Sequence, residues 1–234
     1  MPKLALPSLD IFANPLFARF WAGRWFATLA VQIQAIAMSW QVYDSAREHG
    51  QSIAEAAFLL GLVGLAQFLP LLVLSLFGGQ AADRYNRKLI LVACILAKAV
   101  IVAGLVLVTR FDAPLIIPAV FAAAIGAGAI NAFMPPAATA LMPMLLPRAD
   151  LPQGVAWSSL AFNSGLIVGP AIGGLLYGLG ASVPYSVALA LLAISAALMF
   201  TLRAPPQEPV KDARTLGLIV EGLRFVWGNK IVLG

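Results

Sequence analysis

Four carboxamide side chains stand out because each lies near the middle of a long apolar run. They are Gln32, Gln67, Asn131 and Asn163. Polar side chains are costly in hydrocarbon, so they face a protein interior or a water-filled path. The pattern therefore predicts a polar cavity inside the protein.

Two basic side chains, Arg24 and Lys98, lie in the same kind of run. Arg24 is about one turn inside the edge and can extend to the interface, whereas Lys98 lies roughly 14 Å from the start of its run. Burying an unpaired lysine costs about 2.5 to 3.5 kcal/mol. No Asp or Glu occurs at mid-depth, so we expect Lys98 to have no acidic partner in this chain. It would meet a carbonyl, a cavity water, an anionic substrate group or a carboxylate from another half, and both basic residues join the predicted cavity.

A polar stripe runs along the first apolar segment. Arg24, Thr28, Gln32 and Ser39 fall within an arc of about 80° at roughly 100° per residue. Two interpretations remain open for this stripe. It lines the cavity, or it joins helices through hydrogen bonds of around 0.6 kcal/mol each.

Charged residues are concentrated after the second run, where Asp83, Arg84, Arg87 and Lys88 follow Gly78 and Gly79 in what reads as a tight turn. A carboxylate there can cap a neighbouring helix N-terminus, which carries unpaired N–H groups and partial positive charge. The arginines beside it can hold or release a second element, as a charge-based latch. The simpler alternative is an anchor that fixes orientation, which explains the basic residues but not Asp83.

The fifth run contains Gly165, Gly169, Pro170, Gly173 and Gly174. Small residues four apart let two helices approach closely, and the proline removes one backbone hydrogen bond and bends the helix. We expect a bendable, close-packed gate, with generic helix packing as the alternative.

The elements that position these residues follow from composition. Of the 234 residues, 61% are hydrophobic and 11% are charged, against roughly 25% charged in soluble domains. The mean hydropathy is +0.91. At about 20 residues per crossing, the chain holds six spans and no soluble domain of ordinary size, so we expect an all-α integral membrane protein with a six-transmembrane-helix bundle. The predicted spans are Ala18–Tyr43, Ala56–Phe77, Leu89–Thr109, Leu115–Leu141, Val155–Leu179 and Pro184–Leu202.

The basic residues predict the orientation. Outside the spans, Arg47 and Arg110 fall on one side and the other eleven Lys and Arg on the opposite side. By the positive-inside rule, both termini are cytoplasmic. The basic residues are spread singly rather than in a stripe, which argues against nucleic acid as a partner.

The charged turn resembles the cytoplasmic loop signature of the major facilitator superfamily, through Gly79, Asp83, Arg84, Arg87 and Lys88 at these spacings. Two positions depart from that pattern: Ala81 replaces a larger aliphatic residue and Asn86 replaces a glycine. Asn tolerates the left-handed backbone conformation, so we expect the turn to be preserved.

The glycines of the fifth run resemble the antiporter signature of exporters in the same superfamily. The segments Trp40–Tyr43 and Gly61–Pro70 are similar to bacterial exporters of the enterobactin-exporter and macrolide-efflux type. Drug exporters often carry an arginine in the fourth span where this chain has Ala122, so its role in proton coupling cannot be transferred.

The resemblance implies half of a twelve-span facilitator fold, built from 3+3 inverted repeats. We expect a cytoplasmic N-terminal segment (1–17), the six-span domain (18–202), and a cytoplasmic linker with the start of a seventh span (203–234), the natural chain continuing beyond Gly234. The alternative for the apolar residues after the linker is an amphipathic helix that lies at the membrane interface. The implied function is export of a drug, siderophore or metabolite across the bacterial inner membrane by alternating access. A coupling ion, such as a proton, and a C-terminal half or partner chain are implied as partners.

A rival interpretation is a non-transporting six-span interaction protein or an inactive truncated remnant. Six further spans encoded beyond Gly234 would favour the exporter, and a stop codon there would favour the rival. The sequence shows no carboxylate pair, His/Cys cluster or nucleophile motif. We therefore expect no enzyme activity, no cofactor and no metal site.

Overall fold

The computed structural model describes residues 9–111 and 115–203, which form six long helices joined by short connections. The helices are α1 (Pro15–Glu48), α2 (Ile53–Arg84), α3 (Arg87–Phe111), α4 (Ile116–Leu141), α5 (Leu151–Tyr177) and α6 (Ser182–Thr201). Short 3-10 turns precede α1 (Leu9–Ala13) and connect α4 to α5 (Met142–Met144 and Arg148–Asp150). The all-α fold class is confirmed, whereas the predicted linker and seventh span lie outside the described residues.

The start of α1 is fixed by Asn14. Its side chain accepts hydrogen bonds from the backbone N–H groups of Leu16 (3.0 Å) and Phe17 (3.4 Å), which are two of the unpaired donors of the first turn. The same side chain donates to the carbonyl of Leu145 at 2.9 Å. The segment before the first helix is thus tied to the connection between α4 and α5.

The second helix is longer than the sequence predicted. It continues through Gly78, Gly79 and Asp83 to Arg84, so only Tyr85 and Asn86 separate it from α3. Gln80 to Ala82 are good helix formers, which explains why the expected turn is helical. The turn is preserved at Asn86, but not through a left-handed conformation, because no non-glycine residue of the described ranges has a positive φ. Its side chain instead accepts from the N–H of Leu89 at 3.2 Å and caps α3.

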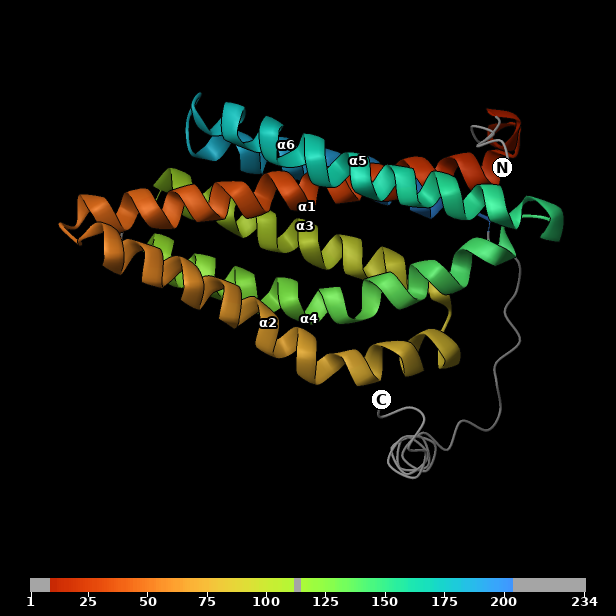
Figure 1. Cartoon of the computed structure of the whole chain (residues 1–234), viewed down its shortest axis with the longest axis horizontal. Coiled ribbons are helices and arrows are strands. Elements are labelled where there is room, and N and C mark those ends of the chain that lie inside the picture. The colour runs from red at the N-terminus through yellow and green to blue at the C-terminus, as the bar shows by residue number, and fades with distance from the viewer. Residues whose placement is uncertain (1–8, 112–114, 204–234) are drawn as a thin grey trace, which may run out of the picture.

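The packing has the symmetry of two repeats. The second helix packs mainly on α4, and α5 packs mainly on α1, on opposite sides of the bundle (Figure 1). The pairs α1–α6, α3–α4 and α3–α6 complete the main contacts. Exchanging α1, α2 and α3 for α4, α5 and α6 maps this set of contacts onto itself, as expected for 3+3 repeats. Each repeat's second helix packs against the other repeat's first helix.

All six helices run between two ends of the molecule. The start of α1, the α2–α3 turn, the α4–α5 connection and the end of α6 meet at one end (Figure 1). This end, called the basic end below, carries Arg84, Arg87, Lys88, Arg148 and Arg203. The opposite end carries Arg47 and Arg110.

Five helices of the described ranges, α2 to α6, are long and apolar enough to cross a membrane. The remaining helix, α1, has 34 residues and spans roughly 51 Å. It is less apolar because it carries residues such as Arg24, Gln34 and Gln41. It packs against α2, α5 and α6, and Gln34 and Gln41 are buried in the protein rather than exposed to lipid.

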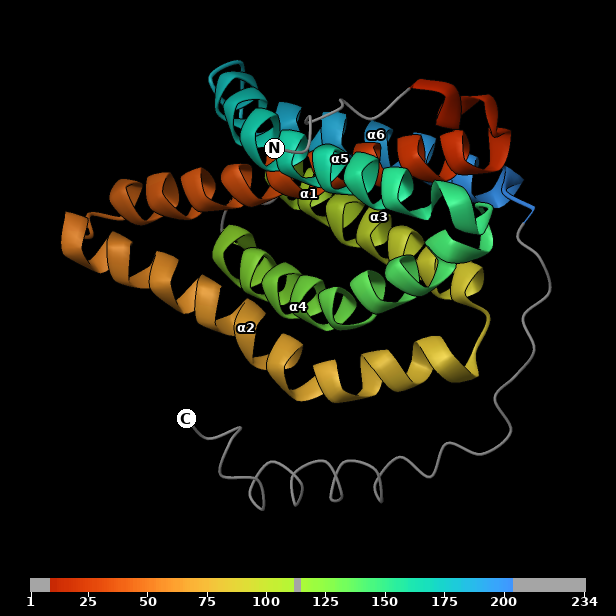
Figure 2. The ribbon, with the colours of Figure 1, turned by 45° about the vertical axis from the view of Figure 1, so that its right-hand side comes forward.

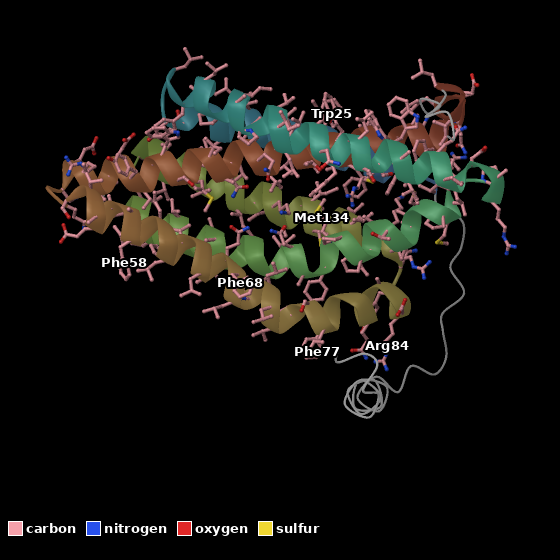
Figure 3. All side chains as sticks on the ribbon, viewed as in Figure 1. Trp25, Phe58, Phe68, Phe77, Arg84 and Met134 are labelled. Carbon is pink, nitrogen blue, oxygen red and sulfur yellow. The ribbon has the colours of Figure 1, made fainter. Side chains whose placement is uncertain are left out.

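The outer face of α2 is apolar and exposed. Phe58, Phe68 and Phe77 point away from the bundle (Figure 3) and are 51 to 67% exposed. A surface of this kind suits lipid or another transmembrane segment rather than water.

Prolines bend α2 and α4. Pro70 lies inside α2, while Pro135 and Pro136 lie inside α4, and both helices change direction near their middle (Figure 2). A proline inside a helix cannot donate to the carbonyl four residues earlier. The two prolines of α4 therefore leave the carbonyls of Asn131 and Ala132 without their usual intrahelical partners.

Candidate functional site

Two adjoining cavities lie between α1, α4 and α5. The larger, called the basic-end cavity, has a volume of about 290 Å³, and the smaller, called the central cavity, about 110 Å³. The basic-end cavity is lined by Phe20, Arg24, Ala138, Thr139, Met142, Val155, Ser158, Ser159, Phe162 and Asn163. The central cavity is lined by Arg24, Ala27, Thr28, Val31, Gln32, Lys98, Asn131, Met134, Pro135 and Phe162. Arg24 and Phe162 belong to both, so they form the boundary between the cavities.

Lys98 lies at the wall of the central cavity and is 3% exposed. Its Nζ donates a hydrogen bond to Oδ1 of Asn131 at 2.8 Å, which joins α3 to α4. The sequence left the partner of Lys98 open, and the structure identifies it as a side-chain amide. An amide satisfies one donor of the ammonium but does not neutralise its charge.

Arg24 is half-buried and faces both cavities. Its guanidinium donates no hydrogen bond to any residue within 9–111 or 115–203. A guanidinium carries five N–H donors, so this side chain presents an unsatisfied cationic surface to the cavities.

The prolines of α4 add polarity at the same depth. Asn131 and Pro135 both line the central cavity. Since Pro135 has no N–H, the backbone carbonyl of Asn131 lacks its usual donor four residues along the helix. The backbone of α4 thus supplies an acceptor beside the Lys98–Asn131 hydrogen bond.

The structure separates the members of the polar stripe on α1. The hydroxyls of Thr28 and Ser39 donate to backbone carbonyls four residues earlier in their own helix, so neither joins α1 to a neighbour. Gln32 lines the central cavity. Thr28 also lines the central cavity, so the geometry favours the cavity interpretation for Gln32 and Thr28. It favours neither interpretation for Ser39, which lines neither cavity.

Of the other predicted cavity residues, Asn163 lines the basic-end cavity, where its Nδ2 donates to the carbonyl of Ser159 at 2.9 Å. Gln67 lines neither cavity. It lies on α2 at the point where Gly128 of α4 approaches its backbone. The structure therefore brings together five of the six residues and places Gln67 at the α2–α4 contact.

Three glycines of α5 lie against α1. A Cβ at Gly165 would come within 2.6 Å of Thr28, one at Gly169 within 2.5 Å of Gln32, and one at Gly173 within 3.1 Å of Ile33. Gly174 has no such neighbour within 4 Å, because it lies about 100° around the helix from Gly173. Pro170 lies inside α5 between these contacts.

The charged residues at the α2–α3 turn divide into two pairs. Arg87 and Lys88 are half-buried: Arg87 donates to the carbonyls of Ala82 (3.1 Å) and Ala140 (3.2 Å), and Lys88 donates to Phe200 at 3.0 Å. These carbonyls belong to the last turns of α2, α4 and α6, where cations are favourable. Asp83 and Arg84 are exposed, and at Gly79 an added Cβ would meet no atom within 4 Å.

Sequence reasoning missed a polar network near the opposite end. Tyr185 Oη donates to Gln41 Oε1 at 2.7 Å, and Gln41 Nε2 donates to Thr109 Oγ1 at 2.8 Å, which links α6, α1 and α3. Nearby, Tyr177 Oη donates to Asp44 Oδ2 at 2.9 Å, which links α5 to α1. Gln41 is a polar residue within a predicted apolar span, as Gln32 is, so the same criterion could have selected it from the sequence.

These features define a class of protein. Two cavities with polar and basic side chains in their walls lie between α1, α4 and α5, and five of the six described helices are long and apolar enough to cross a bilayer. Within the described ranges, no group of three or more His, Cys, Asp or Glu side chains could hold a metal ion. The molecule is a multi-pass α-helical membrane protein.

Comparison with known proteins gives the family. A family model described as "Transmembrane secretion effector" matches residues 7–232. The chain is 34% identical to the multidrug efflux pump Tap of Mycolicibacterium fortuitum, over 86% of this chain and 49% of the relative. It is 26% identical to the enterobactin exporter EntS of Shigella boydii (94% of this chain, 51% of the relative). It is 32% identical to the MFS efflux pump atnC of Emericella nidulans (80% and 38%).

The chain belongs to the major facilitator superfamily, which confirms the resemblance inferred from the α2–α3 turn and the glycines of α5. It spans about half the length, or less, of the curated relatives it matches. Those relatives are named as pumps and exporters rather than enzymes, which fits the expected lack of enzyme activity.

Proposed function

We propose that this chain is the N-terminal half of a secondary exporter that carries a small molecule across the membrane by alternating access. The observation that carries the proposal is the pair of cavities between α1, α4 and α5, in a bundle with the symmetry of two inverted repeats. Inverted-repeat transporters bind substrate near mid-depth, at the interface between repeats. The relatives named as efflux pumps and exporters support export as the direction.

Substrate would bind among Arg24, Gln32, Lys98, Asn131 and Asn163. These side chains surround the two cavities, and Phe162 forms part of the boundary between them. Gln67 would affect the binding site indirectly, because it lies where α2 and α4 touch. Movement of α2 against α4 would then change the shape of the site.

The exposed pair Asp83 and Arg84 would form the latch, facing a second six-span half or a partner chain. Arg87 and Lys88 support this role by holding the turn on the ends of α2, α4 and α6. The close contacts of Gly165 and Gly169 with α1 would provide the gate.

The proposed orientation places the basic end in the cytoplasm, by the positive-inside rule. Both ends of the bundle's chain, at the start of α1 and the end of α6, lie at the basic end (Figure 1). With bacterial exporters among the relatives, we assign the protein to the bacterial inner membrane. A proton is the proposed coupling ion, and its carboxylate carrier would come from the other half, because the described helices hold none at mid-depth.

The test is accumulation in whole cells lacking their own efflux pumps. Cells that produce the full-length protein containing this sequence are compared with empty-vector cells across a panel of siderophores and antibiotics. We expect lower accumulation of at least one compound. That difference should be lost in Gln32→Ala, whose side chain lines the central cavity, and kept in Gln34→Ala, which is bonded to Met38 on the same helix.

Accumulation that is unchanged for every compound, with the protein present in the membrane, would refute export and favour a non-transporting role. Equal loss in Gln32→Ala and Gln34→Ala would refute the placement of the site.

A further inference from the structure

The charges around the two cavities are all of one sign. Arg24 faces both cavities and Lys98 faces the central cavity. The acidic side chains of the described residues are Asp10, Asp44, Glu48, Glu55, Asp83 and Asp150, and each belongs to a helix end or a connection. The nearest of these to the basic-end cavity along the chain is Asp150, which precedes the lining residue Val155 by five residues (155 − 150), about one and a half turns.

We propose that the cavities bind an amphipathic anion, whose carboxylate, sulfonate or phosphate is held by Arg24. This inference rests on the proposed function only in treating the cavities as the substrate site. Its binding chemistry is measured separately from transport.

The first support is the free donor capacity of Arg24. Its guanidinium has no hydrogen-bond acceptor among the described residues, although the side chain is half-buried on α1. A guanidinium presents a fork of N–H groups that matches the two oxygens of a carboxylate or phosphate. An anionic group would satisfy the donors that the protein leaves unpaired.

The second support is Lys98. Its Nζ is positioned by Asn131 at 2.8 Å, and its charge is not neutralised there. An ammonium has three donors, so two remain after the bond to Asn131. Lys98 and Arg24 share the central cavity, so its positive potential favours an anion and disfavours a cation.

The remaining walls suit an apolar body. Phe20, Phe162, Met142 and Val155 line the basic-end cavity together with the hydroxyls of Ser158 and Ser159. Its volume of about 290 Å³ is at the lower limit of typical ligand pockets. A ligand of one or two rings that carries an acidic group fits both the volume and the chemistry.

The experiment measures binding of three probes with the same ring system but different charge. The probes are tritiated 2-naphthoate, 2-naphthamide and (2-naphthylmethyl)trimethylammonium. Equilibrium dialysis with the purified full-length protein in detergent gives each Kd. We expect naphthoate to bind most tightly and the ammonium most weakly.

Variants assign the preference to one side chain. Arg24→Gln should weaken naphthoate binding by about 10- to 100-fold, the loss expected for hydrogen bonds to a charged group, and leave naphthamide binding unchanged. Arg24→Lys, which keeps the charge, should weaken naphthoate binding by a smaller factor. Arg110→Gln removes an exposed arginine at the opposite end and should change none of the three affinities. Retained naphthamide binding also shows that each variant is folded.

Naphthoate binding no tighter than naphthamide binding, or ammonium binding tighter than both, would overturn the proposal. If Arg24→Gln bound none of the three probes, the Lys98→Gln variant would be measured instead, because the new glutamine amide can still donate to Asn131. Selective loss of naphthoate would then support the site, and no selective loss would refute it. Naphthoate binding in a protein that exports nothing refutes the proposed function and keeps the anion site. Export of cations alone, with weak naphthoate binding, refutes the anion site and supports the proposed function.

Discussion

Adding one methyl group at Gly78 tests how closely α2 and α4 pack. The new Cβ would overlap the backbone carbonyl of Ala132, which cannot rotate away as a side chain would. This is also the carbonyl that Pro136 leaves without an intrahelical donor. Gly78→Ala therefore forces the two helix backbones apart at a point where they touch directly.

The next residue provides a matched control. An added Cβ at Gly79 meets no atom within 4 Å, so Gly79→Ala gains the ordinary helix-forming advantage of alanine, about 0.5 to 1 kcal/mol. Overpacking of the kind expected at Gly78 costs about 1 to 3 kcal/mol. The two variants should differ by about 1.5 to 4 kcal/mol in the free energy of unfolding, or roughly 10- to 1,000-fold in the equilibrium constant.

The assay is reversible unfolding of the full-length protein in mixed detergent micelles, followed by tryptophan fluorescence. A second pair repeats the comparison from the other helix: an added Cβ at Gly128 overlaps the backbone of Gln67, while at Gly126 it meets only the end of the Ile101 side chain, at 2.8 Å. Gly128→Ala should be the less stable of this pair. If Gly78→Ala were as stable as Gly79→Ala, the close approach of α2 and α4 would be refuted.

Two further predictions concern the ends of the bundle. Asp83→Asn should reduce efflux by the full-length protein at least tenfold without lowering its amount in the membrane, measured by accumulation assays and immunoblotting, and normal efflux would reject the latch. Tyr185→Phe should lower the free energy of unfolding by about 1 to 2 kcal/mol, because it removes the donor to buried Gln41. Tyr85→Phe, at an exposed tyrosine, should have no effect, and equal stability of the two variants would contradict the role of the Tyr185 hydroxyl.

Much of the architecture follows from apolar periodicity and charge. Six helices, their antiparallel order and the concentration of basic residues at one end are all readable from runs of about 20 apolar residues and the charges between them. The ends of the helices are harder to predict from the sequence. The second helix continues to Arg84 because Gln80 to Ala82 favour helix even though two glycines precede them.

The cavity shows where sequence reasoning stops. Arg24, Gln32, Lys98, Asn131 and Asn163 could be selected because each is polar at mid-depth. That Lys98 bonds to Asn131 depends on how α3 packs against α4, which sequence spacing within either helix does not specify. Phe20 and Phe162 are ordinary apolar residues in the sequence, and only the arrangement of α1 and α5 makes them cavity walls.

The crossed packing of the repeats has a consequence for synthesis at the ribosome. The second helix finds its main neighbour in α4 rather than in α3, so its native surface is incomplete when the first three helices have been made. From Arg84 to Leu141 the ribosome adds 57 residues (141 − 84), which takes roughly 3 to 11 s at about 5 to 20 residues per second. During that interval α2 resides in the bilayer without its partner, which gives membrane chaperones and quality-control proteases a defined window in which to act on the nascent chain.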